Sequence, residues 1–214
     1  MKKFLITRPT HEIRVTYLFH WGKEILEFAK KKSINFTDFK NGKANRKDVE
    51  KYLKKQNPRL VLFNGHGNTS MICGHDDEPL IISNENEDLL NSKITYAIVC
   101  DAAKKLGKNA VKKGCDAFIG YEGPFGFVRD ASRECNPFKD KFAEPFKEIS
   151  NIIVTSLLKG DSVEESVEKS KHLTSELIKK YSTSDAEPGF KDIRFWLFWD
   201  KFFLNFIGDP TAKF

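Results

Sequence analysis

Residues 60–68 read LVLFNGHGN, and this stretch decides the fold that we expect. Its four leading apolar residues are typical of a central parallel strand that is covered on both faces. Residues 94–101, ITYAIVCD, repeat the pattern, with Cys100 in place of His66 after the apolar run. Strand patterns at 4–6, 34–39 and 117–121 alternate with helical patterns at 18–32, 46–55 and 104–113. This alternation predicts an α/β fold with a mainly parallel sheet.

The remaining chain completes a single domain over residues 1–214. Two short apolar pieces, 71–73 and 80–82, flank an acidic turn and predict a small hairpin. Long helices are predicted at 139–158 and 162–180, and residues 182–189 are predicted to form an exposed loop. We therefore expect a three-layer α/β/α sandwich, with an α/β core at 1–135. A helical C-terminal extension at 136–214 would end in a closing Gly-Asp-Pro segment.

The composition and the cysteines narrow the class of protein. Hydrophobic residues make up 40% of the 214 residues, which is enough for a globular core. The start MKKFLITRP has too few consecutive apolar residues for a secretory signal. No apolar run approaches the ~20 residues that span a bilayer. The four cysteines form neither a CxxC pair nor a disulfide framework. We expect a cytoplasmic protein with no membrane partner, no metal and no cofactor.

The positive charge is concentrated near the N-terminus. Residues 1–60 contain 16 Lys or Arg and 6 Asp or Glu, whereas the whole chain has a net charge of +6. Most of these cations are lysines on helical stretches, without the aromatic residues of an RNA-binding motif. The chain also has no P-loop and no GxGxxG motif. A solvated surface is the favoured interpretation, and a nucleic-acid or nucleotide partner is the less favoured one.

Two potentially reactive side chains follow neighbouring strands of the predicted sheet. Ligands of open parallel sheets bind beyond the carboxyl ends of the strands, where His66 and Cys100 are expected. An imidazole beside a thiol can take its proton and produce the nucleophilic thiolate. The glycines around His66 allow a sharp turn and a close approach of the backbone to a substrate. Taken singly, Cys100 could instead be a small core residue and His66 a turn residue.

The segments LVLFNGHGN, ITYAIVCDAA and KKGCDAFIGY together resemble the caspase–haemoglobinase fold of caspases, legumains, gingipains, separases and CHAT domains. In that clan a His-Gly ends one strand and a Cys ends the next. LLKGDSVEESVEKS is similar to a helix start of CHAT and gingipain-like domains. FLNFIGDPTAKF is similar to the segment that closes the gingipain-like domain. The resemblance covers roughly residues 60–214, and the first strand and helix fit by order.

This resemblance implies a thiol protease, a hydrolase that cleaves peptide or protein substrates through an acyl-enzyme. Cys100 would be the nucleophile and His66 the general base and acid. The N–H groups of Gly67 and Cys100 would form the oxyanion hole. The alternative is a catalytically inactive caspase-like protein that serves binding or assembly, because a fold does not determine an activity.

Charged residues near the cysteine are the candidates for the substrate pocket. Val99 and Asp101 flank the cysteine, where caspases have Gln-Ala and Arg and legumains have Cys-Glu-Ser. Arg14 resembles a clan residue that binds the P1 side chain and would favour an acidic one, whereas Asp101 would favour a basic one. The competing interpretations are a surface charge for Arg14 and a helix cap for Asp101. Glu12 is a candidate to orient His66.

Several other residues are not expected to act chemically. His75, Asp76, Asp77 and Glu78 suggest a metal site, but four consecutive residues cannot all reach one ion, and a hairpin tip is expected. Cys115 is expected to pack at the opposite edge of the sheet, and Cys135 to be a free surface thiol. The aromatic run at 195–199 is expected to be buried against the sheet or between the long helices, rather than to form a partner surface.

Overall fold

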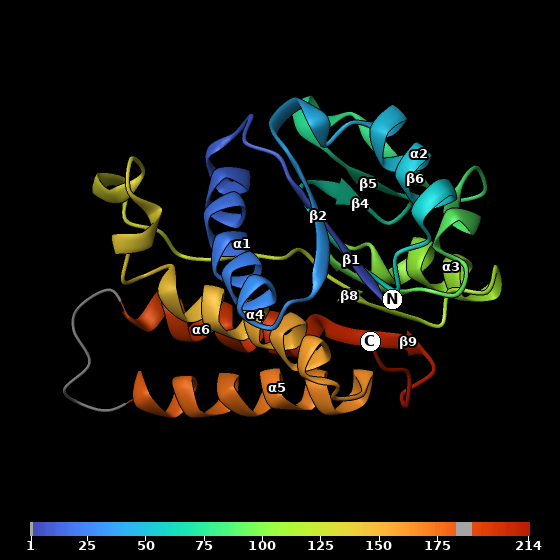
Figure 1. Ribbon diagram of the computed structural model, residues 1–214. Coiled ribbons are helices and arrows are strands. Elements are labelled where there is room, and N and C mark those ends of the chain that lie inside the picture. The colour runs from blue at the N-terminus through green and yellow to red at the C-terminus, as the bar shows by residue number, and fades with distance from the viewer. Residues whose placement is uncertain (1, 183–189) are drawn as a thin grey trace.

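The computed structural model describes residues 2–182 and 190–214. Its main sheet has six strands in the order β2-β1-β3-β7-β8-β9, five of them parallel and the last antiparallel to its neighbour (Figure 1). In chain order they are β1 (Lys3–Arg8), β2 (Asn35–Lys40), β3 (Leu60–Asn64), β7 (Ile94–Ile98), β8 (Ala117–Tyr121) and β9 (Leu204–Gly208). The predicted α/β fold with a mainly parallel sheet is therefore confirmed.

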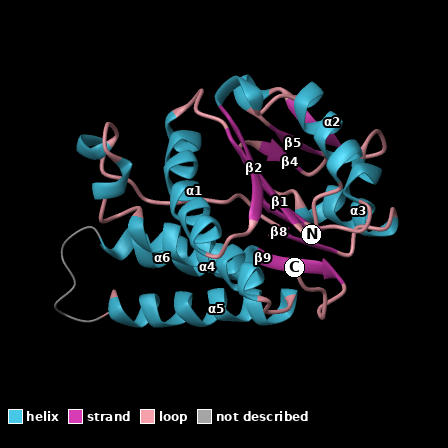
Figure 2. Cartoon of the chain, in the orientation of Figure 1, coloured by secondary structure: helices cyan, strands magenta, loops and turns pink. Residues whose placement is uncertain are grey.

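Helices cover both faces of this sheet, as Figure 2 shows. The helices are α1 (Ile13–Lys31), α2 (Arg46–Gln56), α3 (Lys108–Lys112), α4 (Glu144–Lys159), α5 (Val163–Lys180) and α6 (Phe190–Phe203). One buried cluster joins α1, α4, α5 and α6 to alternate strand residues such as Leu62 and Tyr96. A second joins α2 and α3 to the intervening residues, such as Val61 and Ala97. β3, β7 and β8 are buried throughout, because their side chains point alternately into two cores.

The hairpin expected between the two central strands is a second, three-stranded antiparallel sheet. It consists of β4 (Gly67–Asn68), β5 (Met71–Cys73) and β6 (Pro79–Ile82), with the turn His75–Asp77 between β5 and β6. Ile72, Leu80 and Ile81 are buried in the second core. The small sheet therefore packs over the face of the main sheet that also carries α2.

The helix boundaries depend on local hydrogen bonds and turns that the hydrophobic pattern does not predict. The helix expected from residue 139 begins only at Glu144, because the Asp140 carboxylate accepts the N–H groups of Phe142 and Ala143 ahead of it. At the start of α5, Ser162 and Glu165 form a reciprocal capping box. The helix expected at 104–113 begins instead as a π-helical segment, Ala103–Gly107.

The C-terminal part of the chain is more than a helical extension. β9 pairs with β8 and extends the main sheet, while α4 packs on α1 and α5 packs on α4 and α6. The closing segment is held in place by Ser162, whose backbone pairs with Lys213. Residues 136–214 therefore supply a strand and most of one helical layer of the same sandwich. The exposed loop expected at 182–189 lies, from residue 183 on, outside the described residues.

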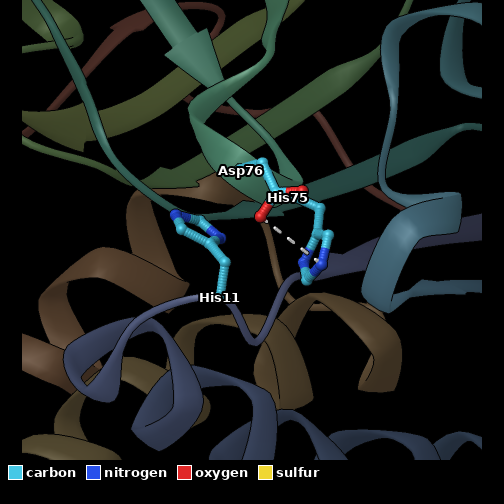
Figure 3. A group of neighbouring side chains, drawn as sticks. All are labelled: His11, His75 and Asp76. Atoms are coloured by element: carbon cyan, nitrogen blue, oxygen red, sulfur yellow. Dashed lines mark ion pairs between the residues drawn. The ribbon is translucent and has the colours of Figure 1, made fainter.

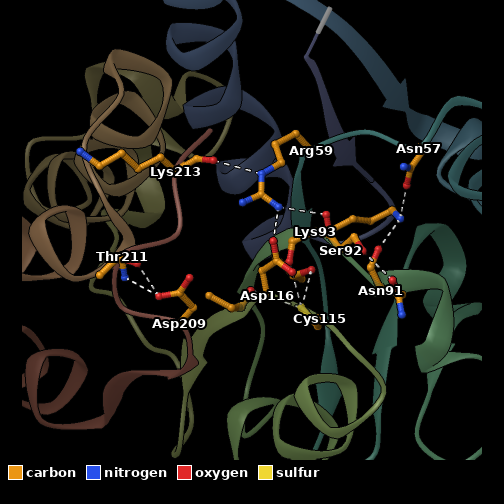
Figure 4. A network of polar contacts seen from close by, with 12 residues as sticks. Asn57, Arg59, Asn91, Ser92, Lys93, Cys115, Asp116, Asp209, Thr211 and Lys213 are labelled. Carbon is orange, nitrogen blue, oxygen red and sulfur yellow. Dashed lines mark hydrogen bonds and ion pairs between the residues drawn. The ribbon is translucent and has the colours of Figure 1, made fainter.

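A polar network joins the amino ends of the central strands, at the edge opposite to His66 and Cys100 (Figure 4). Arg59, just before β3, forms an ion pair with Asp116, just before β8, and donates to the Lys213 carbonyl. The Lys93 ammonium donates to Asn57 and to the Asn91 carbonyl, and burial lowers its pKa. Both chain ends lie on this side, with the Lys2 ammonium 5.9 Å from the centre of the Phe214 ring.

Candidate active site

His66 lies in the turn between β3 and β4, with a glycine on each side. A Cβ on Gly67 would lie 2.3 Å from the Met71 carbonyl oxygen and 2.5 Å from Val99 Cγ1, so only glycine fits. The His66 carbonyl accepts the Cys73 N–H at 2.9 Å, which closes the hairpin. The glycines thus let the hairpin pack against the end of β7, and His66 is held beside the strand that precedes Cys100.

Cys100 follows β7, and its half-buried thiol faces the segment after β8. Its Sγ lies 3.8 Å from the Phe125 carbonyl oxygen. Burial raises the pKa of the Cys100 thiol, and this outweighs the opposing contribution of the Phe125 carbonyl; the carboxylates of Asp101 and Asp200 raise the pKa further, and Arg14 lowers it slightly. The thiol is therefore protonated at neutral pH and needs a base to become a nucleophile.

His66 and Cys100 line the same cavity, whose volume is about 420 Å³. This size lies within the range of small-ligand sites in proteins. Its walls come from the start of α1, the ends of β3 and β7, the segment after β8, and α6. The lining residues are Arg14, Val15, Leu18, Gly65, His66, Ile98, Val99, Cys100, Pro124, Phe125, Gly126, Phe127, Val128, Asp192 and Trp196. The expectation that both side chains reach one edge of the sheet agrees with this lining.

Glu12 contacts His66 and also begins helix α1. The Glu12 Oε2 atom lies 3.1 Å from Nε2 of His66. The same carboxylate accepts the N–H groups of Arg14 and Val15 as the N-cap. Burial raises the pKa of Glu12, but the hydrogen bonds from Arg14, His66 and Val15 outweigh it and hold that pKa below its usual value. An ionised carboxylate therefore fixes one nitrogen of the imidazole.

The candidate substrate-binding residues lie in different surroundings. Arg14 is in the first turn of α1 and lines the cavity, so its charge reaches the site. Asp101 lies outside the cavity lining, and its carboxylate pairs with Lys104 at 2.6 Å. Gly67 is likewise outside the lining, in β4, while Gly65 and His66 are within it. The oxyanion role of the Gly67 and Cys100 N–H groups stays a prediction.

The wall of the cavity that α6 provides was not predicted from the sequence. Asp192 and Trp196 of α6 line it, so a carboxylate lies in the same cavity as the Arg14 guanidinium. The spacing of Ile193 and Leu197 indicates a helical face, but nothing in the sequence pattern shows that Asp192 and Trp196 line the same cavity as the ends of β3 and β7. The expectation for the aromatic run was wrong in part: Leu197 is buried, but Phe195 and Phe198 are 53% and 60% exposed.

Helix α6 also holds the segment that faces the cysteine. Asp200 is 1% exposed and accepts the Gly126 N–H at 3.1 Å, and Trp199 donates to the Pro124 carbonyl at 2.9 Å. A Cβ on Gly126 would meet the Trp196 ring at 2.4 Å. Burial raises the pKa of Asp200 well above its usual value, which the Gly126 hydrogen bond offsets only in part. Residues 124–126 are thus tied to α6 by two hydrogen bonds and close packing.

The other discounted residues divide into two groups. Cys115 is buried against the Lys93 and Ala117 carbonyls, and Cys135 is exposed; both are free thiols, as expected. His75 and Asp76 are at a hairpin turn, as expected, but they meet His11 from the segment before α1. His11, from a distant part of the chain, therefore joins His75 and Asp76 in a group of three side chains that could hold a metal ion.

Comparisons with known proteins do not assign this chain to a family. No family model matches it, and no curated protein matches it. Within residues 2–182 and 190–214, none of the helices has the length and apolar character needed to traverse a bilayer.

Proposed function

We propose that the protein is a cysteine peptidase in which Cys100 attacks a peptide carbonyl and His66 transfers the protons. The observation that carries this proposal is the common cavity of the two side chains, at the carboxyl ends of the adjacent parallel strands β3 and β7. We also propose the caspase–haemoglobinase arrangement, because a His-Gly follows one central strand and a Cys follows its neighbour. Four free cysteines support a reducing, cytoplasmic location.

The state of the thiol determines the order of the steps. Because burial favours the protonated thiol, His66 acts first as a base and removes the Cys100 proton as sulfur bonds to the carbonyl carbon. The imidazolium then donates that proton to the departing amine, which leaves an acyl-enzyme. His66 next takes a proton from water as the water oxygen bonds to the acyl carbon. The carbon–sulfur bond then breaks, the imidazolium returns the proton to sulfur, and the acid is released with the thiol restored. The Glu12 carboxylate stabilises the imidazolium that forms twice in this cycle.

The charges in the cavity suggest how a substrate is selected. Arg14 and Asp192 line it from different helices, and each attracts a P1 side chain of opposite charge. We expect Arg14→Ala to lower kcat/KM for peptides with an acidic P1 residue relative to those with a basic one. Asp192→Ala is expected to shift the same ratio in the opposite direction.

The competing proposal is a peptide-binding protein without hydrolytic activity. The observation that favours it is again the raised pKa of the Cys100 thiol, with Asp101 and Asp200 near enough to disfavour a thiolate. The two proposals differ in whether a covalent acyl-enzyme forms.

A panel of fluorogenic peptides with acidic, basic and apolar P1 residues tests the proposal. Cys100→Ala and His66→Ala are expected to lower kcat/KM by roughly 10³-fold or more, because the dyad acts as a unit. Cys135→Ala, which removes an exposed thiol, is the matched control and keeps the activity. A peptidyl acyloxymethyl ketone should add one adduct at Cys100, detected by intact mass. Folded protein that neither cleaves any peptide nor forms this adduct contradicts the peptidase proposal.

A further inference from the structure

Three histidines from distant parts of the chain lie together beside the cavity. His11 comes from the segment between β1 and α1, His66 follows β3, and His75 is in the turn between β5 and β6. The ring centroid of His11 is 6.0 Å from that of His66 and 5.4 Å from that of His75. Asp76 and Asp77, in the same turn as His75, add two carboxylates. Imidazole and carboxylate groups are the donors that divalent transition metals bind in proteins.

His11 is held in the tautomer that binds metals. Its Nε2 lies 3.1 Å from the Asp77 Oδ1, and a carboxylate can only accept, so Nε2 carries the proton of the neutral ring. The lone pair is then on Nδ1. That atom is buried and has no hydrogen-bond partner within residues 2–182 and 190–214, in a side chain that is only 10% exposed. A histidine ligand that donates its second nitrogen to a carboxylate is the usual arrangement around a protein-bound metal.

His11 belongs to a set of three residues that could hold a metal ion. One ligand atom each of His11, His75 and Asp76 lies within 4.8 Å of the others. Nε2 of His75 is 3.7 Å from Oδ1 of Asp76. Figure 3 shows the two rings and the carboxylate pointing toward one another, with His11 approaching from the segment before α1 and the other two from the hairpin turn.

We propose that His11, His75 and Asp76 bind a Zn²⁺ ion, with water in the fourth position. Two imidazoles and one carboxylate suit Zn²⁺ and are a poor match for Mg²⁺ or Ca²⁺, which prefer oxygen ligands. The ion joins the segment before α1 to the hairpin turn, next to the proposed general base. The site does not depend on the peptidase proposal, since Zn²⁺ binding needs neither Cys100 nor a substrate.

A second group, His11, His66 and Asp77, shares one ligand with this site but fits an ion less well. In that group His66 Nε2 is engaged by Glu12, and the Asp77 carboxylate by His11 Nε2. The first group has its own cost: Nδ1 of His75 accepts the Thr10 N–H at 3.3 Å, and an ion on Nε2 moves the proton to Nδ1. That hydrogen bond is long, so its loss costs little compared with two imidazole–zinc bonds.

Zn²⁺ titration against a chromophoric chelator tests the site, with metal-free protein carrying Cys100→Ala and Cys135→Ala to remove the accessible thiols. We expect one Zn²⁺ per chain, and a Kd that rises at least tenfold in His75→Ala and in His11→Ala. His66→Ala should keep the Kd, as should His172→Ala, the matched control, whose side chain is 76% exposed on α5. Zn²⁺ should raise the Tm of the parent protein and leave that of His75→Ala unchanged.

Asp76→Asn and the spectrum of bound Co²⁺ test the proposed ligands further. Asp76→Asn changes a side chain that is 80% exposed, so it should fold and still weaken Zn²⁺ binding, even where a histidine variant does not fold. Co²⁺ in place of Zn²⁺ should give visible bands without the sulfur-to-metal charge transfer of a thiolate ligand. An unchanged Kd in both His75→Ala and Asp76→Asn overturns the proposal. Loss of binding in His66→Ala alone assigns the ion to the second group and overturns it as well.

Discussion

At the scale of single residues, Glu12 links the fold to the proposed chemistry. Its carboxylate caps α1 through Arg14 and Val15 and also contacts Nε2 of His66. Both contacts involve a charged acceptor, which makes each stronger than a neutral hydrogen bond. The two tasks can be separated because a short polar side chain can cap a helix but cannot reach the imidazole.

We predict that Glu12→Ser keeps the stability and lowers the activity. Serine is a good N-cap, so the free energy of unfolding should change by less than about 0.5 kcal/mol. Loss of the charge-assisted hydrogen bond leaves His66 less well oriented, which should raise the activation free energy by about 1.5 kcal/mol. This corresponds to roughly a tenfold fall in kcat/KM. Urea unfolding and the best fluorogenic substrate provide the two measurements. Unchanged kcat/KM in a folded variant would show that Glu12 serves α1 alone.

At the scale of elements, α6 determines the shape of the cavity wall. It contributes Asp192 and Trp196 to the lining and holds residues 124–126 through Asp200 and Trp199. The buried Asp200 carboxyl has a second oxygen, Oδ2, without a hydrogen-bond partner in the part of the chain that the structure describes. Its ionisation is therefore coupled to the stability of the packing between α6 and the wall.

This coupling predicts a pH dependence. The pKa of Asp200 is raised well above its usual value in the folded protein, whereas in the unfolded chain it is about 3.9. Above about pH 4 the unfolded chain loses this proton and the folded protein keeps it, so this residue makes the protein less stable as the pH rises. Asp200→Asn has no ionisable group at this position, so this fall in stability with rising pH is absent. The variant's free energy of unfolding, relative to wild type, should increase from pH 4 to pH 8 in urea titrations. A difference that stays constant over this range would contradict the assignment.

The elements also show what could be predicted from the sequence. β3, β7 and β8 were predicted within one residue, because short apolar runs between turns have few alternatives. β9 was not predicted, since residues 204–208 follow an aromatic helix without a break and pair with a strand more than 80 residues earlier. His66 and Cys100 were proposed as candidates from their positions after strand ends. Arg14 was proposed from the resemblance, and Glu12 from the same loop between the first strand and helix. Asp192, Trp196 and His11 were not proposed, because their contacts depend on packing between distant segments.

At the scale of the whole molecule, residues 1–135 and 136–214 share the core that includes α1, α4, α5 and α6. Without residues 136–214, β8 would lose its partner β9, and the sheet face that includes Phe4, Leu62, Tyr96 and Ile119 would lose α4 and α5. We predict that residues 1–135 alone do not fold. Circular dichroism and urea titration should show no cooperative transition, and size exclusion should show aggregation. A cooperative transition in this fragment would mean that 1–135 is an independent unit.

The position of the chain ends has a practical consequence. Lys2 and Phe214 are close to one another beside the Arg59–Asp116 pair, at the edge of the sheet away from His66 and Cys100. A short peptide linker between them can therefore cyclise the backbone, which restricts the unfolded chain without obstructing the mouth of the cavity. Tethering either terminus to a solid support should likewise leave the cavity open to long peptides.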